Sequence, residues 1–314
     1  MSERETVLVT GASGFIGSIL VEMLARQGYR VLATDAQESS RTSRFTAIPG
    51  VEFHVLDLRH RDALAPVVAQ ADRIVHLAAL RPAAASANPR TAFEVNVAAA
   101  YDLIELAAQN DVRRIVYGSS HSVYGAFAQP RVFRHREYEI AEGRGLAMYG
   151  ASKLAVEAYL QAHANTGGSP YISLRLGTIY GPGVNRDNSL GGMMMDAVDA
   201  VSAGERAVVE WEPDAQHDLL FVTDAAASIV AALQVDTEET VINVVGEPVS
   251  TTQLFGELVT LAGGDISAID WMGGKARYQM VSQDRMLAVL GPVPTSLREG
   301  LQAFLNWHLG SQTT

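Results

Sequence analysis

The sequence contains no cysteine, which excludes disulfide bonds, thiolate zinc sites and a cysteine nucleophile. Basic residues are also few: 24 Lys and Arg stand against 35 Asp and Glu, so the formal net charge is −11. Nucleic-acid binding and docking on anionic membranes both need a basic surface, and this balance argues against them. No stretch reaches the roughly 18 apolar residues of a membrane helix, and no signal peptide is visible. We therefore expect a cytoplasmic protein.

Length and composition predict a folded α/β protein. The 314 residues allow two domains, and 48% hydrophobic with 19% charged residues is a globular composition. Predicted strands cover residues 6–10, 30–34, 51–56, 73–77, 114–117 and 171–176, and predicted helices cover 15–27, 91–110 and 149–164. Because these strands are continuously apolar and alternate with helices, we predict a parallel sheet covered on both faces. This is the Rossmann-type doubly wound fold.

The second half of the chain is less regular. The patterns predict helices at 191–203, 224–233, 251–262 and 297–309, and a strand at 219–222. We expect residues 1–176 to form the Rossmann-type domain, with return segments near 215–245. Residues 177–314 would form mainly a smaller substrate-binding lobe. The methionines of segment 191–195 suit either ordinary core packing or a flexible pocket cover. The charged segment 131–144 is predicted to be a solvated flap beside the site.

A glycine-rich turn follows the first predicted strand, as Gly11-Ala12-Ser13-Gly14-Phe15-Ile16-Gly17. Gly11 permits a tight turn, Gly14 lets a pyrophosphate approach the backbone, and Gly17 lets the next helix pack closely on the strand. The free amides and the positive end of that helix favour phosphate groups. The pattern therefore predicts a dinucleotide site. A tight turn without a ligand is the alternative.

Two carboxylates follow the next two strands. Asp35 is placed to accept hydrogen bonds from a ribose 2′-hydroxyl and to repel a 2′-phosphate, which favours NAD over NADP. Arg41 and Arg44 follow closely and complicate that preference. Asp57, with Leu58 after it, is a candidate for contact with the adenine. The alternatives are a simple turn residue for Asp35 and a helix N-cap for Asp57.

Tyr149 and Lys153 stand four residues apart and share one face of a predicted helix. A phenol has an ordinary pKa of about 10, and a neighbouring ammonium group favours its ionised form. Tyr149 is therefore a candidate acid/base residue, although an ordinary surface pair has the same spacing. The chain has one other lysine, Lys275. Ser119 and Ser120 follow the fifth strand, where loops line the ligand crevice. They are candidates to donate a hydrogen bond to the reacting oxygen, and a turn or capping role is the alternative.

Taken together, these motifs resemble the extended short-chain dehydrogenase/reductases of the NAD-dependent epimerase/dehydratase family, which act largely on nucleotide sugars. The resemblance covers most of the chain and is carried by segments 10–17, 76–79, 96–97, 119–125, 149–153, 174–183 and 218–224. It implies that Tyr149 is the acid/base residue and that Ser120 polarises the reacting oxygen. Lys153 would lower the pKa of Tyr149 and hold the nicotinamide ribose. The implied chemistry is hydride transfer between a carbinol carbon and NAD.

The predicted cofactor contacts come from the motifs and the resemblance together. Residues 77–79 would line the central part of NAD, and Asn96 would shape the site. A buried amide satisfied by backbone is the alternative for Asn96. The full predicted set is Gly11, Gly14, Phe15, Ile16, Gly17, Asp35, Asp57, Leu58, Leu77, Ala78, Ala79, Asn96, Tyr149, Lys153 and Ile179. The eight histidines lack the spacing of a metal site, so no metal is expected.

Three departures from the family pattern bear on the substrate. His121 and Ser122 stand where dehydratases carry an Asp-Glu pair, which disfavours dehydration. Thr178 replaces an Asn that often touches the sugar nucleotide, and His217 replaces an Arg that clamps the diphosphate. These losses favour a smaller substrate, namely a free sugar, a sugar acid or another hydroxy compound. The predicted substrate-binding residues are Ser120, His121, Tyr149, Thr178 and His217.

Three functions stay open. The leading prediction is an NAD-dependent oxidoreductase acting on a small sugar, sugar acid or carbonyl compound. The second is a redox-neutral nucleotide-sugar 4-epimerase, in which Arg186 or Arg206 would replace the missing diphosphate clamp. The third is a non-enzymatic dinucleotide sensor. We also expect a homodimer formed through helices 91–110 and 149–164, although their apolar stripes equally suit packing on the sheet.

Overall fold

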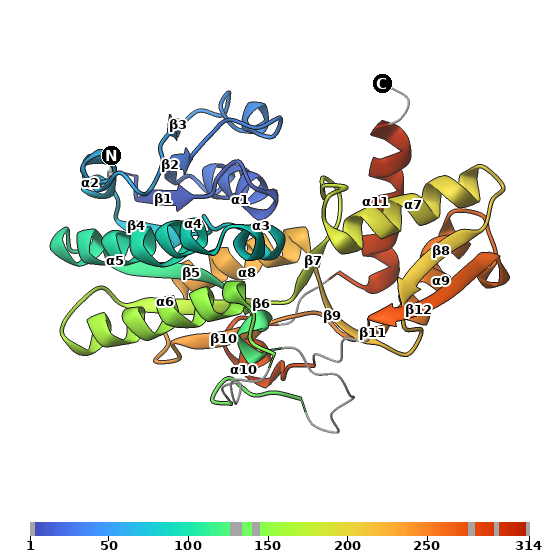
Figure 1. Cartoon of the computed structure of the whole chain (residues 1–314). Helices are drawn as coiled ribbons and strands as arrows, with labels where there is room; N and C mark the ends of the chain where they lie inside the picture. The colour runs from blue at the N-terminus through green and yellow to red at the C-terminus, as the bar shows by residue number, and fades with distance from the viewer. Residues whose placement is uncertain (1–3, 126–133, 140–144, 276–279, 292–294, 312–314) are drawn as a thin grey trace.

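A sheet of seven parallel strands forms the centre of the larger domain (Figure 1). The computed structural model describes residues 4–125, 134–139, 145–275, 280–291 and 295–311. The sheet order is β10-β6-β5-β4-β1-β2-β3. Its strands are β1 (Thr6–Thr10), β2 (Arg30–Asp35), β3 (Val51–Val55), β4 (Arg73–His76), β5 (Arg114–Ser120), β6 (Tyr171–Leu176) and β10 (Val241–Val244). The order reverses between β1 and β4, which confirms the doubly wound prediction and puts the ligand crevice at the carboxyl ends of these strands.

Helices cover both faces of this sheet because strand side chains alternate between the faces. Val7 and Val9 pack into one apolar cluster, whereas Leu8 packs into another. The first cluster includes residues of α1 (Phe15–Arg26), α8 (Val222–Gln234) and α10 (Asp284–Val289). The second includes residues of α2 (Arg61–Val68), α5 (Ala99–Gln109) and α6 (Met148–Asn165). Within the described ranges, none of the helices has the length and apolar character needed to cross a membrane.

A smaller lobe stands beside the carboxyl ends of the strands (Figure 1). It contains a three-stranded sheet of β7 (Thr178–Tyr180), β9 (Gln216–Phe221) and β11 (Pro248–Ser250), and a pair formed by β8 (Ala207–Trp211) and β12 (Ile269–Lys275). Its helices are α7 (Ser189–Ser202), α9 (Thr251–Leu261) and α11 (Leu297–Ser311). Met194 and Met195 are buried in its core, which supports the core-packing interpretation. The helices α8 and α10 and the strand β10 return to the large sheet. Of these, α8 and β10 lie within the segment 215–245 that was expected to return, whereas α10 lies outside it.

The region predicted as one helix over 91–110 is divided. It consists of α4 (Pro89–Phe93), a π-helical segment η2 (Glu94–Ala98) and α5, and it is preceded by the short α3 (Pro82–Ala87). Three 3₁₀ turns, η1 (Thr42–Arg44), η3 (His121–Tyr124) and η4 (Ile266–Ala268), were also not predicted. Most of the missed elements are three to six residues long, too short to show a hydrophobic period.

The predicted solvated flap is wrong for two of the residues described at 134–139, whereas the other four are exposed. His135 and Glu137 are buried, and the backbone N–H of His135 donates to the Met280 carbonyl. The Glu137 carboxylate accepts a hydrogen bond from the backbone N–H of Asn243 on β10. These buried polar groups find partners inside the protein, so this part of the segment docks against the large domain. Residues 131–133 and 140–144 lie outside the described part of the chain.

Candidate active site

Close packing leaves no room for a side chain at Gly11, in the turn between β1 and α1, or at Gly17, in the first turn of α1. Gly11 has φ +71, and a Cβ atom there would lie 2.7 Å from the backbone nitrogen of Ala78. A Cβ atom on Gly17 would lie 2.2 Å from the Gly11 carbonyl oxygen. Gly14 is the extended N-cap of α1, so the backbone amides of Phe15, Ile16 and Gly17 precede the first hydrogen bond inside the helix. This bare helix end at the switch point fits the pyrophosphate of a dinucleotide.

The two predicted adenosine contacts have different surroundings. Asp35 lies beside the glycine turn, where its carboxylate accepts hydrogen bonds from the Ser13 hydroxyl at 2.6 Å and the Ser13 amide at 3.1 Å. Asp57 pairs with Arg59, whose hydrogen bond lowers the pKa of that carboxyl. The N-cap of α2 is His60, so the capping interpretation of Asp57 is wrong. The Leu58 side chain is buried in the core, which leaves only its backbone for a cofactor contact.

A buried amide side chain fixes the segment after β4. Residues 77–79 are half-buried at the end of β4, as the predicted lining requires. The Asn96 side chain, from the π-helical segment, accepts a hydrogen bond from the Leu80 amide at 2.7 Å and donates to the Leu80 carbonyl at 3.1 Å. It also donates to the Ser152 hydroxyl of α6 at 3.2 Å. Asn96 therefore ties this segment to α6. Ile179, on β7, is half-buried against the core of the large domain.

The structure brings the predicted catalytic residues to one end of the sheet. Lys153 is buried, and its Nζ donates to the Gly118 carbonyl at 2.7 Å. The same Nζ lies 5.6 Å from the centre of the Tyr149 ring. Ser120 ends β5, and its Oγ accepts a hydrogen bond from the Ser122 amide at 3.1 Å. The capping role is therefore present, and it holds the Ser120 hydroxyl at the carboxyl end of the strand.

Burial determines the charges of the Tyr149–Lys153 pair. It raises the pKa of Tyr149 to about 12, and the charge of Arg81 opposes this shift. It lowers the pKa of Lys153 to about 7, and the charge of Glu157 opposes this shift. A positive nicotinamide ring near the phenol would stabilise its ionised form. Tyr149 therefore needs the positive charge of a bound nicotinamide ring beside it in order to act as a base.

The lowered pKa of Lys153 predicts a pH-dependent stability. Between about 7 and its ordinary value of 10.5, the unfolded chain binds one more proton at this lysine than the folded chain does. Stability of the cofactor-free protein should therefore rise with pH in this window, by about 1.4 kcal/mol per pH unit. Urea unfolding at several alkaline pH values, compared with Lys153→Met, measures this contribution. Equal pH slopes for the two proteins would contradict it.

The three predicted substrate residues outside the catalytic set lie on three further elements. His121 begins η3 directly after Ser120. Thr178 starts β7 and is aligned with Leu219 of the neighbouring β9. His217 of β9 is only 8% exposed, its Nε2 lies 2.8 Å from the Thr251 hydroxyl, and its ring stacks on Trp211 at 4.6 Å. The His217 ring is thus part of the lobe's interior wall, and its contact with a substrate stays a prediction.

The arginines proposed to replace the diphosphate clamp are engaged elsewhere. Arg186 pairs with Asp199 at 2.7 Å, and Arg206 pairs with Asp270 at 2.6 Å. Arg41 donates to the Gly183 carbonyl of the smaller lobe at 2.5 Å, so it is already engaged between the two lobes. No group of three or more His, Asp or Glu that could hold a metal ion occurs in the described segments.

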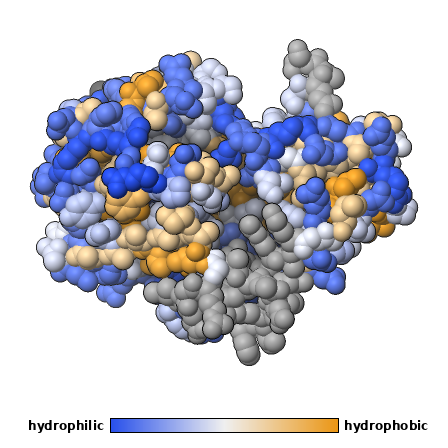
Figure 2. Space-filling view, viewed as in Figure 1, coloured by the Kyte–Doolittle hydropathy of each residue, from blue (hydrophilic) through white to orange (hydrophobic). Residues whose placement is uncertain are grey.

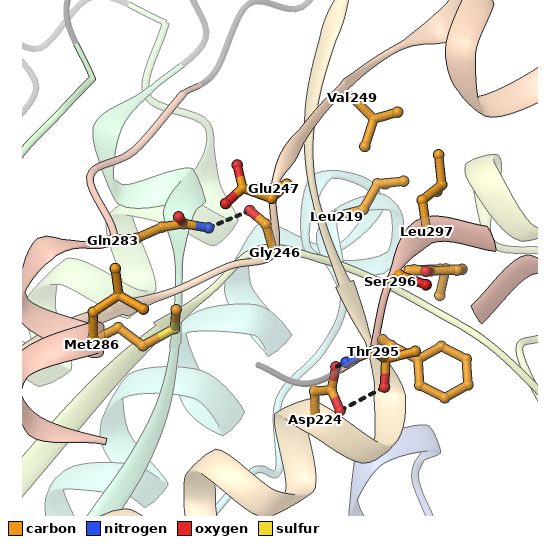
Figure 3. Close-up of a pocket in the computed structure, with 13 residues that line it drawn as sticks. Leu219, Asp224, Gly246, Glu247, Val249, Gln283, Met286, Thr295, Ser296 and Leu297 are labelled. Carbon is orange, nitrogen blue, oxygen red and sulfur yellow. Dashed lines mark hydrogen bonds between the residues drawn. The ribbon is translucent and has the colours of Figure 1, made fainter. Parts of the chain in front are cut away.

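A separate cavity of about 360 Å³ lies between β9, β11, α10 and the start of α11 (Figure 3). Leu219, Val249 and Leu297 supply apolar walls. At its edge, Asp224 accepts a hydrogen bond from the Thr295 hydroxyl at 2.9 Å. Ser120, Tyr149 and Lys153 are not among the described residues that line it. The described lining of this cavity therefore lacks the candidate catalytic residues.

Comparisons with known proteins identify the family of this chain. A model of the NAD dependent epimerase/dehydratase family matches residues 7–245. A UDP-glucose 4-epimerase from Thermotoga maritima, solved with UDP-glucose, aligns at TM-score 0.87 with 23% identity, covering 98% of this chain and 99% of its own. The Thermus thermophilus UDP-glucose 4-epimerase, solved with NAD, aligns at TM-score 0.83 with 25% identity and the same coverage. A dTDP-4-dehydro-6-deoxy-D-allose reductase from Streptomyces is 27% identical, over 96% of both chains. This chain therefore belongs to the NAD-dependent epimerase/dehydratase family, and its cofactor is NAD.

Proposed function

We propose that the protein inverts a hydroxyl-bearing carbon of a nucleotide sugar without net oxidation. Support comes from the placement of Ser120, Tyr149 and Lys153 at the dinucleotide cleft of a chain that matches UDP-glucose 4-epimerases over nearly its whole length. This proposal takes the place of the small-substrate dehydrogenase as the leading function. The departures at Thr178 and His217 favoured the dehydrogenase, whereas the catalytic residues are common to both functions and do not distinguish them.

The catalytic residues have distinct tasks. NAD, when bound, supplies a hydride acceptor that also returns the hydride. Tyr149 takes the proton of the substrate hydroxyl as a base and gives it back as an acid. The Ser120 hydroxyl donates a hydrogen bond to the same oxygen. Lys153, held by the Gly118 carbonyl, stabilises the Tyr149 phenolate when its amine is protonated, and a bound nicotinamide ring would add to this effect.

A net oxidoreductase acting on a smaller substrate is the second candidate. The observation in its favour is the absence of a guanidinium at position 217, together with the carboxylate partners of Arg186 and Arg206. A diphosphate binds best to a forked, charged donor, which a stacked histidine does not provide. The Streptomyces relative, named as a reductase, shows that net redox chemistry occurs among similar chains.

One assay separates the two candidates. Purified protein is incubated with UDP-glucose and a panel of other nucleotide sugars, and the products are identified by chromatography and NMR. Parallel samples contain NAD with free sugars and sugar acids, and NADH absorbance is followed. We expect an epimeric nucleotide sugar with no accumulation of NADH. NADH formed from a free sugar, without any epimer, would replace the epimerase proposal with the second candidate.

The exposed face of α6 predicts a homodimer. Apolar residues gather over α6 on the face seen in Figure 2. Tyr159 of α6 is 44% exposed and Phe93 of α4 is 49% exposed, and Tyr101 of α5 packs edge-on against Tyr159. We expect light scattering to give the mass of a dimer and Tyr159→Glu to shift it toward a monomer. A monomeric wild-type protein would remove this expectation.

A further inference from the structure

A buried ion pair lies behind the catalytic residues and has no task in the chemistry described above. Glu157 follows Tyr149 and Lys153 along α6 at four-residue intervals, so the three side chains share one stripe of the helix. Arg175 lies on β6, opposite Ser119 of β5 in the sheet register. Glu157 is 6% exposed and Arg175 is 3% exposed. Both charges are therefore withdrawn from water.

The guanidinium of Arg175 holds the Glu157 carboxylate with two nitrogens. Nη2 donates to Oε2 at 2.7 Å, and Nε donates to Oε1 at 3.0 Å. A planar fork of this kind fixes direction as well as distance. The Ser119 hydroxyl donates to Oε1 of the same carboxylate at 2.5 Å. A single carboxylate therefore joins α6, β5 and β6.

The other side of the guanidinium holds the turn that follows the catalytic serine. Nη1 of Arg175 donates to the Tyr124 hydroxyl at 2.8 Å and to the Glu137 carbonyl at 2.9 Å. The Tyr124 hydroxyl in turn donates to Oδ1 of Asn243 at 2.7 Å. Tyr124 ends η3, the turn that Ser120 caps. Ser120 thus lies between two residues tied to the ion pair, one through the carboxylate and one through the guanidinium.

Stability alone gives little reason for an ion pair at this place. Removing two charges from water offsets most of their attraction, and apolar side chains of similar size often stabilise a fold equally well. What the pair provides is a fixed relation between β5 and α6. These two elements carry Ser120 and Tyr149, which must reach the same substrate oxygen. A misplacement of about 1 Å between such groups can lower a rate about 100-fold.

We propose that Glu157 and Arg175 are positioning residues that hold Ser120 and Tyr149 at the spacing required for catalysis. This inference rests on the proposed function insofar as it uses the tasks of those two residues. The Glu157 carboxylate has a second effect, which is on Lys153. Burial lowers the pKa of Lys153, and the negative charge of Glu157 opposes that shift. The pair thus supports both the position of Tyr149 and the charge beside it.

A double variant, Glu157→Leu with Arg175→Met, tests the proposal. It replaces the pair by apolar side chains, so no single charge is left buried. We expect it to fold and to bind NAD as the wild type does, with KM within about twofold and kcat lowered about 10-fold or more. If the pair served only the fold, its replacement would change thermal stability, but kcat would not fall while KM stayed nearly the same. A folded double variant with wild-type kcat would overturn the proposal.

Glu157→Gln provides the second test. It becomes the deciding experiment in case the double variant does not fold. The amide keeps the size of the side chain and an acceptor for Ser119, but it loses the charge that aligns Arg175. We expect kcat to fall while NAD affinity is kept. Wild-type kcat in this variant would also overturn the proposal. The matched control is Glu52→Gln, which removes an exposed pair with Arg30 at the sheet edge and should leave kcat unchanged.

The proposed function and this inference can fail separately. If the wild-type protein turns over a free sugar instead of a nucleotide sugar, the kinetic comparison is made with that substrate. If it turns over neither, the proposed function fails, and crystal structures of the wild type and the double variant with NAD decide the inference. We expect the Ser120 hydroxyl to shift by about 1 Å relative to the Tyr149 hydroxyl. Superimposable positions would overturn the inference.

Discussion

Replacing Tyr149 with phenylalanine should lower turnover by about 10²–10⁴-fold while NAD binding and the unfolding temperature change little. The substitution removes one hydroxyl from a half-buried ring and leaves the ring itself in place. The hydroxyl is the group proposed to take up the proton of the substrate, so its loss should stop that transfer. The measurement is the rate of product formation at saturating substrate, together with the affinity for NAD.

The matched control for this substitution is Tyr159→Phe, ten residues further along the same helix, where the ring is exposed. It should retain wild-type turnover. Turnover that survives Tyr149→Phe would show that another group moves the proton. If wild type and variant both bind NAD and neither turns over any substrate offered, the result favours the third function, a non-enzymatic dinucleotide sensor.

Gly17→Ala should produce the second large effect, on cofactor binding. The added Cβ atom would lie 2.2 Å from the Gly11 carbonyl oxygen and 2.9 Å from the Ala12 Cα. Both are backbone atoms, so α1 must move away from the turn that receives the pyrophosphate. Overpacking of this kind costs about 1–3 kcal/mol, and we expect a lower unfolding temperature and a clearly weaker affinity for NAD.

Calorimetry with NAD and a thermal unfolding series measure both effects of Gly17→Ala. The control is Gly310→Ala near the end of α11, where no atom lies within 4 Å of the added Cβ. That variant should bind NAD normally. If Gly17→Ala bound NAD with wild-type affinity, the close packing of α1 on the turn would not be what shapes the phosphate site.

The larger domain was predictable because its elements are long and locally patterned. The strand Thr6–Thr10 and the helix Phe15–Arg26 have uniform or periodic burial that the sequence displays directly. The smaller lobe was less predictable, since β7 and β11 are three residues each and gain their structure by pairing with β9. Pairing across 30 or more residues leaves little local trace, so propensity and period alone did not indicate these strands.

The same distinction applies to the site. Tyr149 and Lys153 were predictable because four residues separate them on one helix. The link from Glu157 to Ser119 and Arg175 was not, because 38 and 18 residues separate the partners and their types are common in ordinary surface pairs. His217 shows a further limit, since its identity suggested a substrate contact, whereas its burial against Trp211 depends on the fold.

The π-helical segment Glu94–Ala98 acts as a phase shift within one continuous helical rod. On one side of it, α5 turns Leu103 and Ala107 into the core beneath the sheet. Within it, Asn96 faces Leu80 and Ser152. An ordinary α-helix rotates by about 100° per residue. Deleting one residue from this segment would therefore turn either the α5 side chains away from the core or Asn96 away from Leu80 and Ser152. Point substitutions preserve this phase, whereas a one-residue deletion would sacrifice either the core contact or the site contact.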